Sequence, residues 1–465
     1  MRIAIIGAGL AGLTAAYEIH KTDPNIHIDV LEAGERIGGK LFTVPFASGP
    51  TDMGAEAYLA TRTDATEFFH ELGLGDSLVA PSGARSQFYA GGQLRPMPRG
   101  GVMGIPSSSE GLEEILSDKT RELIDAEALT APLDWQVGAD QTVGALVRAR
   151  YSDEVVDILV SALLGGVYSS SADDLGIRAT VPALAAALDR LAESGEPVTL
   201  SGAVKLVETE RAETRKNTET TPVFQTFRGG YAELYEALAD QCGADIHLDS
   251  FVSAITSANG GGFQIKGGGE GTYDRVILAV PAPTAAVLLR DLAPAAGPHL
   301  KAIKLASSAV VGMKFDSAAG LPEVSGVLVA MGEPDVTAKA FTFSSNKWPH
   351  LGQRGGALVR ASFGRLGDEA TARMDEDDLV DAALDDLQTI TGFDGRAAGL
   401  EEIFVQRWFG GLPSYGVDHI ATVAAARTEI SQVEGLEAIG AWTSGVGVPA
   451  VIADARAAVA RLLDA

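Results

Sequence analysis

The chain of 465 residues contains a single cysteine, Cys242, so it cannot form an internal disulfide or a cysteine metal cluster. This scarcity is typical of a reducing compartment, and we predict a cytoplasmic location. The seven histidines lack the short spacing of histidine metal motifs, so no metal site is predicted. The longest apolar run, residues 276–289, contains two prolines and is too short for a transmembrane segment.

Basic residues are also scarce, with 36 Lys and Arg against 62 Asp and Glu and a net charge of −26. Nucleic acids and anionic lipid surfaces bind basic protein surfaces, so neither is expected as a partner. We interpret the acidic excess as a solubilising surface. Hydrophobic residues make up 46% of the chain, which indicates a globular protein with a large core, and the length allows about three domains.

The most informative pattern lies in residues 1–32. The apolar run Ile3–Ile6 precedes Gly-Ala-Gly-Leu-Ala-Gly at 7–12, an alanine-rich helical pattern follows, and a second apolar run ends at Glu32. In such a strand–turn–helix–strand unit the first glycine makes the turn, the second admits a pyrophosphate and the third lets the helix pack on the strand. The pyrophosphate then meets the helix N-terminus, and Glu32 can accept hydrogen bonds from ribose hydroxyls. Three glycines and the lack of a cleavage site argue against the alternative, a signal peptide.

The rest of the chain alternates between helical and strand patterns. We expect a helix at 62–80, a hairpin at 86–94, and a helical block from Glu110 to Val207 interrupted at 165–169. The polar stretch 208–222 is predicted to be a flexible surface loop. Short strands with glycine turns follow at 246–281, then a mainly antiparallel sheet with helices at 303–406, and finally a strand to Gly440, a glycine-rich loop and a C-terminal helix.

Two further segments, Ala33–Lys40 with paired glycines and Thr51–Glu56 with a glycine turn, carry a family resemblance. With the N-terminal unit they resemble the Glu-Arg-x-Gly-Gly and Asp-x-Gly segments of flavoproteins such as monoamine oxidases, phytoene desaturases and protoporphyrinogen oxidases. Six other stretches resemble the protoporphyrinogen/coproporphyrinogen oxidase family, and the Met-Gly-Ile-Pro and Lys-Trp-Pro segments are most similar to its soluble Gram-positive branch. These stretches are Arg95–Pro98, Met103–Pro106, Gly166–Ser169, Thr226–Gly230, Ser344–Pro349 and Gln406–Tyr415.

The resemblance implies an α/β fold with an FAD-binding Rossmann-like domain, a mixed-sheet (α+β) substrate domain and a helical insertion. The corresponding boundaries are 1–80 plus 224–300 plus 408–465 for FAD binding, 81–95 plus 301–407 for the substrate domain, and 96–223 for the helical domain. FAD would be the cofactor, and no metal is expected. The predicted FAD-binding residues are Gly7, Ala8, Gly9, Leu10, Ala11, Gly12, Glu32, Ala33, Arg36, Gly38, Gly39, Lys40, Gly54, Ala55, Glu56, Val252, Ala279, Trp442, Gly447, Val448 and Pro449.

The activity implied by the resemblance is oxidation of coproporphyrinogen III to coproporphyrin III, with O2 as acceptor and H2O2 as product, in haem biosynthesis. The flavin carries the chemistry, so no catalytic side chain is assigned. Four propionates on this substrate favour a cation-lined site, and the aromatic rings are candidates for packing on the macrocycle. The substrate-binding candidates are Lys347, Arg407, Arg95, Tyr168 and Trp408, with Arg99 and Arg360 as further cations.

Three alternatives remain open. A protoporphyrinogen oxidase would share the fold, an amine oxidase would share the flavin site, and a non-catalytic FAD-binding protein would keep only the cofactor signature. An amine oxidase is less favoured because Lys304 and Lys314 lie in no lysine motif typical of that class. The resemblance also implies a transient contact with a ferrochelatase. The chain is expected to be a monomer or a homodimer.

Overall fold

The computed structural model describes residues 1–217, 222–269 and 271–464, and for 215–217 it describes the backbone alone. Contacts divide the chain into two compact units. Unit 1 consists of Met1–Ala80, Pro222–Lys304 and Ile420–Ala465, and unit 2 of Pro81–Thr221 and Leu305–His419. Each unit is therefore assembled from stretches that are distant in the sequence.

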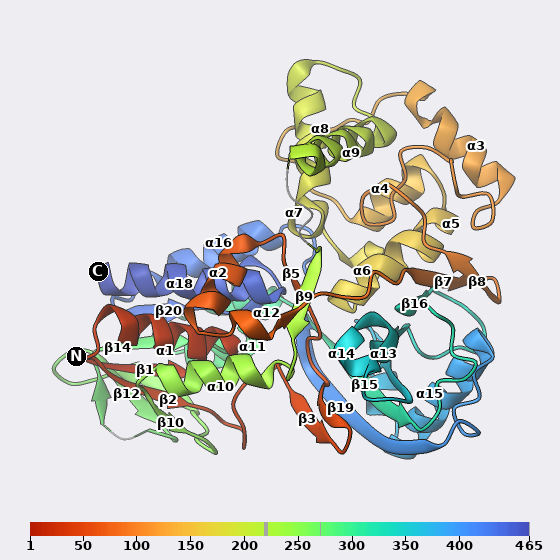
Figure 1. The fold of residues 1–465 in the computed structure, drawn as a ribbon. Coiled ribbons are helices and arrows are strands. Elements are labelled where there is room, and N and C mark those ends of the chain that lie inside the picture. The colour runs from red at the N-terminus through yellow and green to blue at the C-terminus, as the bar shows by residue number, and fades with distance from the viewer. Residues whose placement is uncertain (218–221, 270, 465) are drawn as a thin grey trace. The chain divides into compact units, whose positions relative to one another are not determined.

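Unit 1 is built on a parallel five-stranded sheet in the order β10-β2-β1-β14-β20 (Figure 1). Residues β1 Ile3 and Ile5 point into one hydrophobic core and Ala4 and Ile6 into a second, so the sheet is buried on both faces, as parallel sheets normally are. The strand bounds are β1 (Arg2–Ile6), β2 (His27–Leu31), β10 (Asp245–His247), β14 (Arg275–Leu278) and β20 (Leu436–Ala438).

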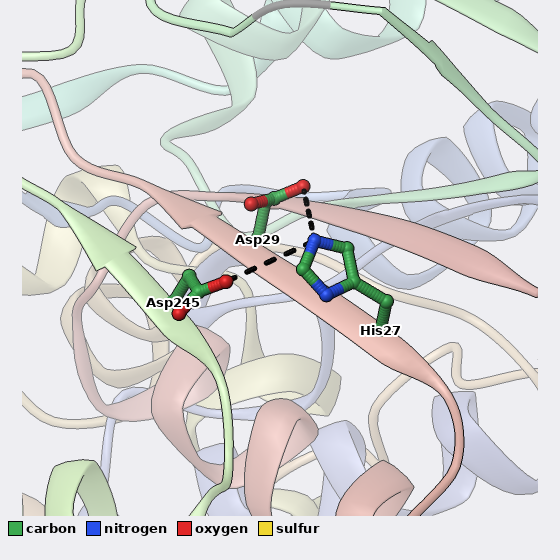
Figure 2. Close-up of side chains that lie close together, drawn as sticks. All are labelled: His27, Asp29 and Asp245. Carbon is green, nitrogen blue, oxygen red and sulfur yellow. Dashed lines mark ion pairs between the residues drawn. The ribbon is translucent and has the colours of Figure 1, made fainter.

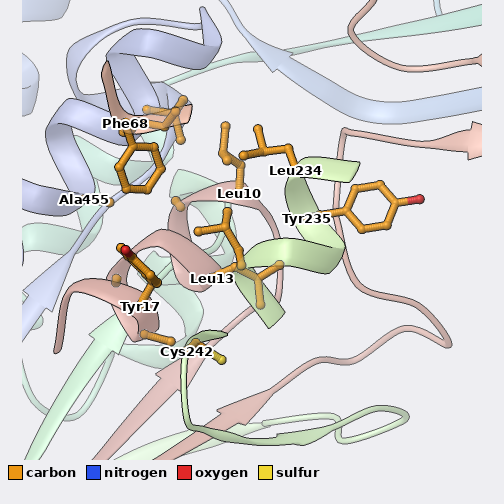
Figure 3. Packing of buried hydrophobic residues seen from close by; sticks show 14 of the residues in the cluster. Leu10, Leu13, Tyr17, Phe68, Leu234, Tyr235, Cys242 and Ala455 are labelled. Carbon is orange, nitrogen blue, oxygen red and sulfur yellow. The ribbon is translucent and has the colours of Figure 1, made fainter. Parts of the chain in front are cut away.

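Helices cover both faces of this sheet. On one face α1 packs against the C-terminal helix α18, and Figure 3 shows Leu10, Leu13 and Tyr17 of α1 among buried side chains that include Phe68 and Ala455. The strand–turn–helix unit predicted from residues 1–32 is therefore present, and α18 covers its helix. The helix bounds of unit 1 are α1 (Leu10–Thr22), α2 (Thr63–Glu71), α10 (Ala232–Gln241), α11 (Ala282–Leu288), α12 (Ala296–Ala302), α16 (His419–Ile430), α17 (Ala441–Ser444) and α18 (Val448–Asp464).

Three small sheets complete unit 1. One is the antiparallel set β11 (Ala254–Ser257), β12 (Phe263–Lys266) and β13 (Thr272–Tyr273), whose turns fall at the predicted glycine clusters. The second is the hairpin β3 (Thr43–Phe46) and β4 (Gly49–Asp52). In the third, β9 (Phe224–Phe227) pairs with β5 (Tyr58–Leu59) and with β6 (Leu78–Val79).

Unit 2 contains a seven-stranded sheet in which β16 and β7 form the parallel pair and the other neighbours are antiparallel. The predicted mainly antiparallel sheet is therefore confirmed. Helix α15 (Glu376–Thr391) lays its buried face on it. The order is β19 (Leu400–Pro413), β15 (Leu305–Phe315), β18 (Ala357–Phe363), β17 (Ala340–Phe343), β16 (Gly326–Val329), β7 (Ser86–Ala90) and β8 (Gln93–Pro96), and α13 (Ser344–Lys347) and α14 (Pro349–Gly352) lie between β17 and β18 in the chain.

The helical block of unit 2 has a core of its own, which supports the proposed helical domain. Whether it is a separate domain stays a prediction, because contacts group it with the sheet in one unit. Its helices are α3 (Asp118–Ala126), α4 (Val143–Arg150), α5 (Asp153–Val155), α6 (Ser161–Tyr168), α7 (Ile177–Thr180), α8 (Pro182–Ser194) and α9 (Leu200–Asn217), with a π-helical turn at Val156–Val160.

Three expectations from the sequence were wrong. The helix predicted at 62–80 ends at Glu71, and β6 follows because its backbone pairs with β9. The glycines at 165–166 do not interrupt the helical block, since α6 continues to Tyr168. Helix α9 includes 208–217, part of the predicted loop, and 218–221 lie outside the described residues. In this part of the helix Glu210 forms an ion pair with Arg190 of α8.

Candidate functional site

The glycine turn between β1 and α1 has the backbone geometry expected of a dinucleotide site. Gly7 has a φ of +108°, which favours glycine, and its N–H donates to the carbonyl of Leu31 at 2.8 Å. A Cβ on Gly12 would lie 1.9 Å from the carbonyl oxygen of Gly7. Both glycines are therefore required by the close packing of the turn.

The N-terminus of α1 offers uncapped backbone N–H groups. Its N-cap residue is Gly9, which has no side chain to satisfy them, and no acidic residue occupies the first turn. An uncapped helix N-terminus carries a partial positive charge and binds phosphate groups. This end of α1 fits the pyrophosphate of a dinucleotide.

The second glycine segment lies directly beside the first. The N–H of Gly38 donates to the carbonyl of Ala8 at 2.9 Å, and a Cβ on Gly39 would come within 2.9 Å of the Cα of Gly9. The structure thus brings together the predicted FAD-binding residues 7–12 and 38–39. Only glycine permits this contact, so the paired glycines have a structural reason independent of any ligand.

The carboxylate of Glu32 joins the end of β2 to both loops. One oxygen accepts from the N–H of Ala8 at 2.8 Å and the other from the N–H of Gly34 at 2.8 Å. A carboxylate has about four acceptor positions, so two remain for hydroxyl donors. Glu32 therefore fits the predicted contact with a ribose.

Arg36 and Lys40 support the same loop in different ways. The Arg36 guanidinium donates to the carbonyls of Gly39 (2.7 Å), Ile37 (3.1 Å) and Leu41 (3.2 Å), and its carbon lies 4.1 Å from the centroid of the Phe42 ring. It therefore holds the loop, and its contact with phosphate stays a prediction. Protein atoms around the Lys40 ammonium lower its pKa, although the side chain as a whole stays exposed.

The segment around Gly54 packs onto Lys40. A Cβ on Gly54 would lie 2.1 Å from the Lys40 carbonyl oxygen, and the N–H of Met53 donates to the carbonyl of Phe42 at 2.7 Å. The segments predicted from the two glycine motifs, residues 33–40 and 51–56, are thus neighbours. The roles of Ala55 and Glu56 in cofactor binding stay predictions.

Val252 has the free backbone that a base-binding residue needs. It is 7% exposed, and among the residues described here its N–H and C=O form no hydrogen bond with protein. Nearby, the N–H groups of Asp249 and Ser250 donate to the carbonyls of Gly34 and Glu32. Buried backbone groups are normally paired, so these orphans fit an adenine contact.

The remaining predicted cofactor residues lie at the carboxyl ends of β14 and β20. The carbonyl oxygen of Ala279 would lie 2.6 Å from a Cβ on Gly7. Trp442, 2% exposed, donates through Nε1 to the Val280 carbonyl at 3.1 Å. Parallel strands end at one edge of a sheet, where such sheets bind ligands. Gly7, Glu32 and Ala279 therefore share this edge with the start of α18, where Gly447 precedes the helix and Val448 and Pro449 are its first residues.

The short helix α17, which follows β20, is held in place by Asp454 of α18. Its buried carboxylate accepts from Thr443 Oγ1 at 2.6 Å and Ser444 Oγ at 3.0 Å, and it pairs with Arg427 of α16. Burying a carboxylate costs little free energy when hydrogen-bond donors and a cation satisfy it. Asp454 was not predicted from the sequence, because its partners come from two other elements, α16 and α17.

In unit 2 the predicted substrate residues do not converge. Arg95 lies on β8 and Arg407 and Trp408 on β19, the two opposite edges of the seven-stranded sheet, about 29 Å apart at the usual strand spacing. Lys347 ends α13, and its ammonium lies 5.2 Å from the centroid of the Trp348 ring. Arg95 and Arg407 therefore cannot hold the same carboxylate.

Arg407 and Tyr168 also contact other protein groups. Arg407 donates to the carbonyl of Met374 at 2.7 Å and lies 3.9 Å from Glu376. Tyr168 packs its ring against Tyr415 with centroids 5.7 Å apart, and burial raises the pKa of its hydroxyl. Their substrate roles stay predictions.

The structure also assembles a group that the histidine spacing did not reveal. His27 and Asp29 of β2 and Asp245 of β10 place ligand-type atoms within 4.8 Å of one another. Figure 2 shows the three side chains, with dashed lines from His27 to both carboxylates. The sequence search missed this group because its strands are far apart in the chain. Asp29 is already paired with Arg2 at 2.7 Å and with His247 at 3.1 Å, so we assign the group to strand–strand ion pairing.

The glycine turns, the uncapped helix end, Glu32 and the free backbone of Val252 define a dinucleotide-binding flavoprotein. Residues 10–463 match the flavin containing amine oxidoreductase family. The chain belongs to this family and, within it, to the protoporphyrinogen and coproporphyrinogen oxidases. Its cofactor is FAD.

Relatives named coproporphyrinogen III oxidase cover nearly the whole chain. The protein of Mycobacterium tuberculosis (strain H37Rv) is 38% identical, with 99% of this chain and 97% of the relative covered. The Bacillus subtilis protein is 29% identical with the same coverage. The protoporphyrinogen oxidase of Nicotiana tabacum chloroplasts is 25% identical, with 96% of this chain and 82% of that protein covered.

Solved structures confirm the fold class. A crystal structure from Exiguobacterium sp. 255-15 has a TM-score of 0.86 at 28% identity, covering 100% of this chain and 99% of that one. Cyclohexylamine oxidase from Brevibacterium oxydans has a TM-score of 0.70 at 17% identity, covering 100% and 98%, and this likeness concerns the fold alone. Among the described helices, none combines the length and apolar character needed to cross a bilayer.

Proposed function

We propose that the protein oxidises coproporphyrinogen III to coproporphyrin III, with O2 as acceptor, in haem biosynthesis. The observation that carries the proposal is the full-length similarity, at 38% identity, to relatives named for this activity. The M. tuberculosis relative is more similar than the tobacco protoporphyrinogen oxidase, at 25%. The geometry of unit 1 supports an FAD enzyme but does not by itself select the porphyrinogen.

When bound, FAD supplies two-electron redox chemistry. The first N–H groups of α1 would hold the pyrophosphate, the Glu32 carboxylate would hold a ribose, and the backbone of Val252 would hold the adenine. The N-terminus of α18, at Gly447 and Val448, is a helix end that would stabilise negative charge on the ring system. No side chain is assigned to proton transfer.

The overall reaction removes six electrons and six hydrogens from the porphyrinogen in three two-electron oxidations. Each oxidation transfers two electrons and two protons to one O2 and yields one H2O2, so three O2 are consumed per porphyrin. Positioning of the macrocycle, rather than acid–base catalysis by a protein group, is the contribution required of unit 2.

The test is porphyrin fluorescence after FAD-loaded protein is mixed with each porphyrinogen in air. Free FAD at the same concentration corrects for spontaneous oxidation. Faster porphyrin formation from coproporphyrinogen III, with three H2O2 per porphyrin, is expected. A preference for protoporphyrinogen would move the protein to the second candidate function. If neither porphyrinogen is oxidised, amine oxidation is the next candidate and is tested with primary amines. If amines are not oxidised either, a non-catalytic FAD-binding role remains.

Several finer expectations belong to the same proposal. They are a cytoplasmic location, a monomeric or homodimeric state, and handover of the product to a ferrochelatase. Co-purification with a ferrochelatase in the presence of coproporphyrin III, compared with its absence, tests the handover.

A further inference from the structure

Lys339, which directly precedes β17, is a buried cation without a carboxylate partner. Its side chain is 5% exposed, and its ammonium donates to Ser169 Oγ and to the Gly364 carbonyl, each at 2.6 Å. Within the described part of the chain it forms no ion pair. Charged groups are rarely buried without a counter-ion, because desolvation is costly.

A second cation, Arg365, lies beside Lys339 in the loop after β18. Among the described residues its guanidinium forms no hydrogen bond or ion pair, and its Nε is buried without a partner. Burial lowers the pKa of Arg365, and the repulsion from Arg365 contributes to lowering that of Lys339 to about 7 after the larger effect of burial. Two neighbouring cations are thus held together against their mutual repulsion.

This arrangement is unusual in a chain with a net charge of −26. The acidic residue that acts on both cations is Asp368, and it accepts instead from the Thr371 hydroxyl at 2.7 Å. Asp386, on α15, accepts from the backbone N–H groups of Thr337 and Ala338 and faces no cation. Asp368 is near enough to favour the charged form of both cations, but no described carboxylate forms an ion pair with either of them, which leaves room for the negative charge of a ligand.

The backbone around the two cations is fixed. Ser169 ends α6 in the left-handed conformation with a φ of +48°, which is rare for a residue with a side chain. It is clamped by Lys339 through its hydroxyl and by the N–H of Leu366, which donates to its carbonyl at 2.7 Å. Lys339 thereby ties the loop that carries Arg365 to the residue that follows Tyr168.

We infer that Arg365 binds a carboxylate of the substrate and that Lys339 positions the Arg365 loop and adds positive charge behind it. The inference rests on the proposed function, under which the carboxylate is a propionate of the porphyrinogen. A planar guanidinium matches a carboxylate through two parallel hydrogen bonds. Lys339 is too buried for direct contact, so it is a positioning residue.

Binding of an anion to this pair should be linked to protonation. The Lys339 pKa of about 7 means that its ammonium is partly neutral near neutral pH, and a bound carboxylate favours the charged form. The complex should therefore take up a proton, and affinity should fall as pH rises through 7. A purely structural lysine would not produce this dependence.

The experiment measures the binding of coproporphyrin III, the stable product with four propionates, to FAD-loaded protein by porphyrin fluorescence between pH 6 and 9. We expect Arg365→Met to weaken binding roughly tenfold or more, as loss of a charged hydrogen bond does, and Arg365→Lys to restore part of it. Lys339→Met should flatten the pH dependence. The control is Arg396→Gln, which removes an exposed cation of the same unit that is paired with Asp381 and Asp385.

The outcomes separate this inference from the function on which it rests. Wild-type protein that binds coproporphyrin and oxidises the porphyrinogen, with an Arg365→Met variant of unchanged affinity, would overturn the carboxylate site alone. Wild-type protein that binds no coproporphyrin would overturn both. A circular dichroism spectrum and a thermal unfolding transition equal to those of wild type confirm that each variant is folded. The proton uptake of wild type, measured by calorimetry in two buffers, should be absent from Lys339→Met.

Discussion

The carboxylate of Glu32 accepts a hydrogen bond from the backbone N–H of Ala8 at 2.8 Å, across two adjacent parallel strands. The bond closes the glycine turn against the end of β2. It also fixes the carboxylate where a ribose is expected, so one side chain sets the shape of the turn and offers acceptors to the cofactor. The same acid therefore links the stability of the loop to FAD affinity.

Glu32→Gln should weaken FAD binding roughly tenfold, because an amide has one acceptor atom where the carboxylate has two, and both are used by Ala8 and Gly34. The dissociation constant is measured by quenching of flavin fluorescence on titration of apoprotein. Glu35→Gln, an exposed neighbour, is the matched control and should bind FAD as wild type does. Equal affinities of the two variants would refute the ribose assignment.

Gly12→Ala should destabilise unit 1 by at least about 2 kcal/mol, because the added Cβ would lie 1.9 Å from the Gly7 carbonyl oxygen and the turn must shift. The measurement is thermal unfolding followed by flavin release. Gly297→Ala, in α12 with open space around the added carbon, is the control and should be neutral or slightly stabilising. A Gly12→Ala protein with wild-type unfolding and FAD content would contradict the packing argument.

Glu127→Gln should destabilise the helical block by about 2–4 kcal/mol. The fully buried carboxylate accepts from the N–H groups of Leu200 and Ser201 at the start of α9 and pairs with Arg150 at 2.7 Å, so its loss leaves a buried cation. Urea unfolding at pH 7 measures the difference. The exposed Glu122→Gln is the control.

The same carboxylate predicts a pH dependence. Hydrogen bonds from Ser201, Leu200 and Arg150 outweigh burial and hold the pKa of Glu127 below its usual value of 4.5. A lowered folded pKa means that the stabilisation is complete above pH 4.5 and is lost as pH falls through the folded pKa. Wild type should therefore lose its advantage over Glu127→Gln in acid. A constant difference across pH 3–7 would contradict this.

Arg407→Ala and Lys347→Ala should each raise KM for coproporphyrinogen more than for protoporphyrinogen, if these cations hold the additional propionates. Steady-state porphyrin fluorescence with both substrates measures the ratio. Arg407 also contacts Met374 and Glu376, and these contacts could be its whole role. Equal effects of the Arg407 substitution on both substrates would indicate that the residue stabilises β19 and does not bind a propionate. Arg396→Gln again serves as a control for the removal of one charge.

The parts of the fold that were predicted correctly depend on local patterns. The unit of β1, α1 and β2 follows from apolar runs, three glycines and one acid, and the hairpin predicted at 86–94 corresponds to β7 and β8. The polar part of α9, residues 208–217, was missed because a polar stretch can equally be a solvated loop. The helix depends on Glu127 at its N-terminus and on packing at Leu200 and Val204.

The residues of the candidate sites also fall into two groups, those predicted from local sequence patterns and those visible only in the folded chain. The FAD-binding residues were found because glycine positions and one acid carry the signal in the sequence itself. Lys339 and Arg365 carry no such signal, since their importance lies in the lack of an ion-paired acid among the described residues, and this lack is visible only when the residue before β17, the loop after β18 and the end of α6 are assembled. Asp454 was hidden for a related reason, as its partners Arg427 and Thr443 lie elsewhere in the chain.

The sheet of unit 1 has a consequence for synthesis on the ribosome. Strand β1 is translated well before its neighbour β14, and β20 and the helix α18, which packs on α1, are translated later still. The apolar face of α1 therefore stays uncovered by α18 while all of unit 2 is translated. FAD can therefore bind only late in synthesis. A chaperone that shields the apolar face of α1 during elongation would raise the yield of FAD-loaded protein.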